Sequence, residues 1–227
     1  MITAPELEIG VLILGIVILM FEAFAAKMDK HLLAFAGILG LAAVLVASFF
    51  VVPSPAANQA TGFWSFYAAD SLSIFFKRFA LLTTILVLIM MIDYAPVLTN
   101  SSAGPKVRSS LGEFFALPIF TCARLMYMAS AIDFIFIFVS LELVTISFYV
   151  LVSFTRRNPA TLEAGVKYLV LSALSTAFLV YGITWIFGAT GQTNLQRITE
   201  ALANSDTDRG VEDEKLSQES RCEWHAC

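Results

Sequence analysis

An apolar run of 24 residues, from Ala131 to Phe154, constrains this chain more than any other feature of its sequence. A helix needs about 20 apolar residues to cross the hydrocarbon core of a bilayer, so this run is long enough to span a membrane. One carboxylate, Glu142, lies near its centre. An ionisable group at the bilayer midplane costs roughly 2.5–3.5 kcal/mol on insertion scales, and such residues usually serve as proton or ion sites. The run therefore predicts both a membrane helix and a functional acid.

The composition extends the membrane prediction to the whole chain. Hydrophobic residues make up 58% of the 227 residues and charged residues only 14%, whereas soluble domains average about a quarter charged residues. This balance indicates an all-α integral membrane protein. The acidic start of the chain lacks the basic region of a cleavable signal peptide, so we expect the first apolar run to remain as a membrane helix. Cys122 is expected to be a packing residue, and Cys222 and Cys227 have neither disulfide-framework nor zinc-ligand spacing.

Further apolar runs predict about six transmembrane helices. Prolines separate several of them, and we expect the third run to end before Pro96, because proline lacks the backbone N–H that a helix interior uses. The expected spans cover residues 8–26, 32–52, 71–94, 111–129, 131–154 and 164–188.

Positive charges between these runs predict the orientation of the helices. The loops after the first, third and fifth spans contain Lys and Arg, whereas the loops after the second and fourth spans contain none, nor does the segment before the first span. Because cytoplasmic loops are enriched in Lys and Arg, this pattern places the N-terminus outside. The cations are Lys27, Lys30, Lys106, Arg108, Arg156 and Arg157.

The outer end of the third span is expected to lie at the membrane interface. Lys77 and Arg78 are adjacent, so they point about 100° apart on a helix and at most one readily faces a neighbouring helix. We expect both to extend outward to the interface. The preceding aromatic residues are typical of an interfacial anchor, with a binding role as the alternative. They are Phe63, Trp64, Phe66 and Tyr67.

Glu142 and Lys167 are the candidate site residues. Burial disfavours the charged form of each group and a nearby opposite charge favours it, so each can exchange a proton at modest cost. The alternatives are structural. Glu142 could be satisfied by a hydrogen bond in helix packing, and Lys167 could reach the interface or pair with Glu163, four residues earlier.

Other charges within the spans have more local explanations. Arg124 interrupts the fourth run without an acid close in sequence, and we expect it to reach Asp133 or to extend outward; a sequence error or a damaging substitution is a further interpretation. Asp133 is expected near the start of its helix, where an acid is favoured by the helix dipole. Glu22 is expected at the membrane interface, close to Lys27.

Two segments resemble a known family. They read MASAIDFIFIFVSLELVTISFYVLVSFTRR and LEAGVKYLVLSALSTAFLVYGITWIFGATGQTNL. Both are similar to subunit N of the proton-pumping NADH:quinone oxidoreductase, respiratory complex I, in which an acid within L-E-L is followed by a basic loop, by E-A-G-x-K-Y and by a helix of small residues ending in Y-G. The resemblance covers residues 1–204 and is most specific over 128–195. It implies an antiporter-like membrane subunit in which Glu142 and Lys167 relay protons.

The resemblance also implies an activity for the parent complex. NADH and quinone would react on partner subunits, because this chain has no glycine-rich nucleotide fingerprint and no set of cysteine ligands. No cofactor or metal is expected on the chain itself. The expected partners are other membrane subunits of complex I and the lipid bilayer, with no nucleic acid, in the bacterial inner membrane. The alternatives are a free-standing monovalent cation/proton antiporter, carrying H⁺ or Na⁺, and a non-conducting truncated fragment.

Family members are roughly twice as long and contain two inverted repeats. The chain is therefore expected to correspond to the N-terminal portion. Residues 1–110 would form the first three membrane helices, and residues 111–195 would begin the proton-translocating domain. Residues 203–227 are polar and highly charged, do not resemble the family, and are expected to be disordered. A frameshift or a premature stop in a longer gene would explain this tail.

Overall fold

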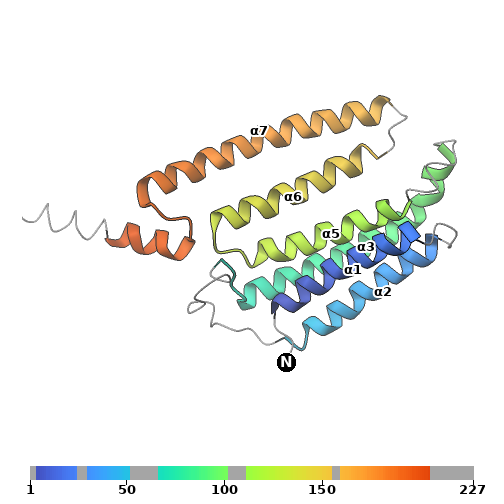
Figure 1. The fold of residues 1–227 in the computed structure, drawn as a ribbon, viewed down its shortest axis with the longest axis horizontal. Helices are drawn as coiled ribbons and strands as arrows, with labels where there is room; N and C mark the ends of the chain where they lie inside the picture. The colour runs from blue at the N-terminus through green and yellow to red at the C-terminus, as the bar shows by residue number, and fades with distance from the viewer. Residues whose placement is uncertain (1–3, 25–29, 52–65, 102–110, 155–158, 205–227) are drawn as a thin grey trace, which may run out of the picture.

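The computed structural model describes residues 4–24, 30–51, 66–101, 111–154 and 159–204, which form a layered bundle of long helices (Figure 1). Within those residues, a short helix over 195–204 follows the last long helix. The long helices are α1 (Ala4–Phe24), α2 (Lys30–Ser48), α3 (Ser71–Ser101), α5 (Leu111–Ala129), α6 (Phe134–Val152) and α7 (Pro159–Thr190).

Each predicted apolar run coincides with one of these helices. The bounds of α5 are those predicted, whereas α7 begins earlier than expected, at Pro159. The fixed φ angle of proline suits the first turn of a helix, where no N–H donor is needed. The prediction that the third helix ends before Pro96 was wrong, because α3 continues to Ser101. Proline removes one hydrogen bond from the helix, and a long apolar helix can tolerate that loss.

Three of the described helices are long and apolar enough to cross a membrane. They are α6, α7 and the part of α3 over Ser71–Pro96. The chain is thus a multi-pass membrane protein with an all-α fold, as its composition predicted. A membrane crossing by each of α1, α2 and α5 stays a prediction.

The buried core lies on one side of the bundle. α5 contacts α1, α2, α3 and α6, and Leu41, Leu81, Phe115 and Ile119 are almost fully buried there. Cys122 is also buried, which confirms its predicted packing role. Figure 1 shows α7 as the outermost layer, with α6 between α7 and α5. Gly165 is buried in α7, but many of the large apolar side chains of this helix are exposed and face the surroundings of the described bundle.

Contacts at the two ends of the bundle show how the helices alternate in direction. At one end, the amide of Ala68 donates to the carbonyl of Ser130 over 2.8 Å, and the amide of Leu195 donates to the carbonyl of Ile132 over 2.9 Å. These bonds join the segments before α3, between α5 and α6, and after α7. At the other end, the amide of Gly112 at the start of α5 donates to Glu22 Oε1 near the end of α1, over 2.6 Å. This arrangement matches the alternation expected from the loop charges.

The absolute orientation of the bundle stays a prediction. The side chains of the six loop cations, and residues 205–227 of the tail, lie outside the described residues.

Gly165 permits a close approach between α6 and α7. A Cβ atom there would lie 2.8 Å from Cβ of Ser153, whereas one at Gly182 would meet no atom within 4 Å. Alanine is about 1 kcal/mol more favourable than glycine inside a helix. We therefore expect Gly182→Ala to raise the midpoint temperature of unfolding in detergent and Gly165→Ala to lower it. Equal shifts in the two variants would show that the α6–α7 approach does not depend on Gly165.

Candidate functional site

Glu142 lies in the middle of α6 and turns towards α7. Its side chain is half-buried, and the hydroxyl of Thr176 in α7 donates a short hydrogen bond to its Oε1 atom. The hydroxyl of Thr145 donates to the carbonyl of its own helix at Glu142, over 2.8 Å. Among the described residues, Thr176 is therefore the side chain that positions the acid.

Arg124 lies on the opposite flank of α6. From α5 it donates to the carbonyl of Leu143 over 2.8 Å and to Oγ of Ser147 over 2.6 Å. The expectation that Arg124 reaches Asp133 or extends outward was wrong. A turn of α6 offers it a carbonyl and a hydroxyl at the same depth, which satisfies the guanidinium without a carboxylate. A positive charge consequently sits beside the helix that carries Glu142.

Asp133 caps the N-terminus of α6, as its position predicted. Its carboxylate accepts a hydrogen bond from the amide of Ile135 over 2.9 Å and one from the hydroxyl of Thr193 over 2.8 Å. An acid at this position satisfies a free backbone N–H and complements the helix dipole. Asp133 thus fixes the start of α6 and ties it to the segment after α7.

Lys167 lies near the start of α7 and is largely exposed. Its Nζ atom is 2.6 Å from Oε1 of Glu163, which confirms that these two residues can pair one helical turn apart. Lys167 and Thr176 are nine positions apart, which corresponds to about 13–14 Å of helix and to opposite faces of α7. The described residues therefore do not bring Lys167 into contact with Glu142. Lys167 faces away from α6, on the side of α7 that nothing in the described bundle covers.

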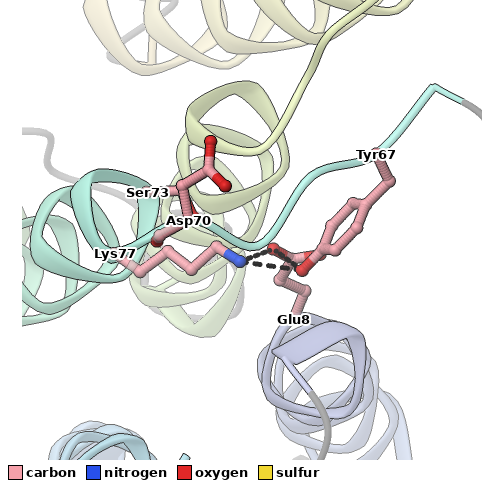
Figure 2. Close-up of polar contacts among 5 residues, drawn as sticks. All are labelled: Glu8, Tyr67, Asp70, Ser73 and Lys77. Atoms are coloured by element: carbon pink, nitrogen blue, oxygen red, sulfur yellow. Dashed lines mark hydrogen bonds and ion pairs between the residues drawn. The ribbon is translucent and has the colours of Figure 1, made fainter. Parts of the chain in front are cut away.

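A buried ionic cluster lies at the end of the bundle where α3 begins. Lys77 of α3 and Glu8 of α1 are 1% and 0% exposed, and Nζ of Lys77 is 2.8 Å from Oε1 of Glu8. Lys77 also donates to the phenol oxygen of Tyr67 over 2.7 Å, and the phenol donates to the same Glu8 oxygen over 3.0 Å. Figure 2 shows the three polar groups converging between α1 and α3.

The outward position expected for Lys77 was wrong. Its neighbour Arg78 instead runs towards the end of α2, where it donates to the carbonyl of Ser48 over 2.9 Å and stacks over the ring of Phe49 at 4.5 Å. The two cations point in different directions, as adjacent helical positions require. A buried acid one turn into α1 provides the partner that makes burial of Lys77 possible. Opposite charges at similar depths of two helices were the available signal for this pair.

Tyr67 is part of the buried cluster and not of an interfacial belt. Its side chain is only 5% exposed. Burial, followed by the negative charge of Glu8, raises the pKa of the Tyr67 phenol. The phenol therefore keeps its proton and can donate to Glu8 while it accepts from Lys77. Phe63 and Trp64, the first two residues of the expected belt, lie outside the described residues.

No metal-binding group is found within the described part of the chain, where no three His, Cys, Asp or Glu side chains gather. The cluster of Cys222, His225 and Cys227 lies outside that part.

These features define a class of protein: a multi-pass helical membrane protein with ionisable groups held between its helices. A family model for NADH:quinone oxidoreductase/Mrp antiporter transmembrane proteins matches residues 131–216. The chain is 35% identical over 201 residues to NADH-quinone oxidoreductase subunit N 2 of Koribacter versatilis, which covers 87% of the chain and 39% of that protein. It is 37% identical over 182 residues to subunit N of Heliobacterium modesticaldum, and the match covers 80% of this chain and 36% of that protein. The chain is thus similar, over most of its own length, to part of these antiporter-like membrane subunits, as the two motif segments predicted.

Solved structures of respiratory membrane complexes share the fold. A chain of respiratory complex I from Thermus thermophilus with bound aureothin is 24% identical, with a TM-score of 0.63 over 83% of this chain and 38% of that chain. A chain of the membrane-bound sulfane sulfur reductase, an archaeal respiratory membrane complex, is 19% identical with a TM-score of 0.61. This match covers 86% of this chain and 39% of that chain. The chain thus spans less than two fifths of the length of these relatives, and it corresponds to their subunit only in part.

Proposed function

We propose that this chain is part of a membrane subunit of NADH:quinone oxidoreductase and contributes to proton translocation coupled to electron transfer from NADH to quinone. The observation that carries the proposal is Glu142, a half-buried acid in the middle of an apolar helix, held by Thr176 of the next helix. It lies within the region that matches the family model. Relatives with 35% and 37% identity are named as subunits of this enzyme complex.

In this proposal Glu142 accepts and releases a proton within the bilayer. A carboxyl group held between helices is suited to this task because it can carry a proton while a neighbouring helix fixes its position. Thr176 holds Oε1, and Arg124 adds a positive charge on the other flank of α6. Lys167 is the next proton carrier. Because it faces away from Glu142, transfer between the two requires water or side chains beyond the described residues.

The remaining assignments follow from the same family. Residues 1–110 support the complex structurally, and residues 111–195 begin the proton-translocating domain. NADH, quinone and the redox groups belong to partner subunits, and this chain carries no redox site. The complex resides in the bacterial inner membrane, with the N-terminus of the chain outside.

Reconstitution of the parent complex tests the proposed function. The complex that co-purifies with the tagged chain is placed in lipid vesicles, and NADH oxidation and the internal pH are recorded together. We expect NADH and a quinone to drive acidification that an uncoupler abolishes. Failure of the chain to co-purify with any NADH-oxidising complex would contradict the proposal.

A second candidate is a free-standing monovalent cation/proton antiporter, favoured by the inclusion of Mrp antiporters in the matching family. It needs the same half-buried acid. Vesicles containing the chain alone distinguish the two functions, since an antiporter would move protons when a Na⁺ gradient is imposed without NADH.

A further inference from the structure

The buried cluster of Glu8, Tyr67 and Lys77 has an unused acceptor atom. Oε1 of Glu8 accepts hydrogen bonds from both Tyr67 and Lys77. Oε2 of Glu8 is buried and has no hydrogen-bond partner among the described residues. A buried acceptor without a partner is unfavourable, and more so when it is charged. The geometry at Oε2 therefore favours an additional proton or a water molecule.

A pocket lies next to this cluster. It has a volume of about 520 Å³ and is formed by the start of α3, the end of α5 and the connection to α6. Most of its lining is apolar, but Asp70, Ser73 and Ser130 contribute polar groups. Figure 2 shows the carboxylate of Asp70 pointing away from Glu8. Asp70 is exposed, and Ala68 and Ser130, which flank the cluster, are among the other lining residues.

Ser130 is a lining residue of the pocket that also contacts the cluster. Its hydroxyl is buried and has no hydrogen-bond partner among the described residues. It also lies beside the phenol of Tyr67, and its carbonyl accepts from the amide of Ala68 over 2.8 Å. Two buried polar atoms without partners, on Glu8 and Ser130, thus flank the same phenol. A hydroxyl in this position can accept a proton from water and donate one onward.

The charged and titratable groups around Glu8 decide whether it can bind a further proton. Lys77 of α3 offsets the charge of the carboxylate, and Tyr67 stays protonated. Tyr127 of α5 is the other titratable group that interacts with Glu8. Arg78 and Arg124 instead bond to the end of α2 and to α6, respectively. A proton that arrives at Oε2 neutralises the carboxylate and leaves the charge of Lys77 without its partner. Binding of this proton therefore requires that the cost of burying the carboxylate outweigh its attraction to Lys77.

We propose that Glu8, Tyr67 and Lys77 form a second proton-binding site, which exchanges protons with the adjacent pocket through Ser130. In the loading step, a hydronium ion in the pocket gives a proton to the hydroxyl of Ser130, which releases its own proton to a water molecule beside Glu8. An O–H bond of that protonated water then breaks as an O–H bond forms at Oε2 of Glu8. Unloading reverses the step and returns the proton to water. Lys77 holds Oε1 throughout. This site lies between α1 and α3 and is separate from Glu142, and it does not depend on the function proposed above.

Infrared spectroscopy of the chain in lipid vesicles tests this site directly. The carbonyl stretch of a protonated carboxyl group is recorded during a pH titration, and the amide bands of the same spectra report folding. We expect a titrating carboxyl band that is resolved from those of Glu142 and the exposed acids and that is lost in Glu8→Gln. The band is retained in Glu142→Gln and in Glu6→Gln, which removes an exposed acid from the same helix. Tyr67→Phe should shift the band, because it removes one donor to Oε1.

Two further variants keep the test decisive. Glu8→Gln combined with Lys77→Met removes both charges together, so it provides a reference without the band even if the single variant fails to fold. Ser130→Ala should delay the deuterium exchange of the band. If Glu8 stays a carboxylate at every pH at which the chain is folded, the proposal of a proton-binding site is wrong. Unchanged exchange in Ser130→Ala would overturn the route through the pocket.

Discussion

We expect Lys77→Met to lower the free energy of unfolding by about 3–5 kcal/mol, the cost of breaking a buried ion pair by removing one partner. Methionine has nearly the length of lysine, so packing between α1 and α3 changes little. The carboxylate of Glu8 is fully buried and would lose its cation and one of the two donors to Oε1. Denaturation of the purified chain in mixed micelles, followed by circular dichroism, measures the change.

Two controls separate the charge effect from the loss of side-chain contacts. Lys77→Met combined with Glu8→Gln should recover most of the stability, since no unpaired charge remains in the interior. Lys167→Met removes the cation of the exposed pair with Glu163, and such a pair contributes only about 0.2–0.5 kcal/mol. A double variant as unstable as the single one would show that Lys77 acts through its packing.

The helices were predictable because each is encoded by a continuous apolar run. Length and hydropathy identify such segments without reference to tertiary structure. Their ends were less predictable. Pro96 has local properties that disfavour a helix interior, but the helix continues beyond it. Pro159 begins α7, because at a first turn the missing N–H of proline has no cost.

The polar residues also divide into those that the sequence makes predictable and those that it does not. Glu142 and Asp133 were recognisable because one is an isolated acid in an apolar run and the other precedes a helix. The pair of Glu163 and Lys167 depends only on helical spacing. Lys77 differed, because its burial depends on Glu8 and Tyr67, which are distant in sequence and adjacent only after α1 and α3 pack together. A lysine near a helix end is compatible with either an exposed or a buried position, and only the tertiary partner decides between them.

We expect Glu142→Gln to reduce the rate of NADH-driven proton translocation by about 100-fold or more, the range for loss of a positioned proton-transfer group. Glutamine preserves the shape of the side chain and an oxygen that accepts from Thr176, but its amide cannot bind and release a proton near neutral pH. The effect should therefore appear without loss of assembly. Vesicles containing the parent complex provide the measurement, with Glu113→Gln as a control at an exposed acid of α5.

Thr176→Val distinguishes a functional acid from one that serves only helix packing. Valine has the shape of threonine but cannot donate to Oε1 of Glu142, and a hydrogen bond to a charged group contributes about 1.5–3 kcal/mol. We expect proton translocation to fall by about tenfold, since 1.4 kcal/mol corresponds to a factor of ten, and its pH profile to shift. Thr184→Val is the matched control, because the hydroxyl of Thr184 bonds only to backbone carbonyls of α7. If Glu142 were a packing residue, both valine variants would leave the pH profile unchanged, and Thr176→Val would alter only the stability of the contact between α6 and α7.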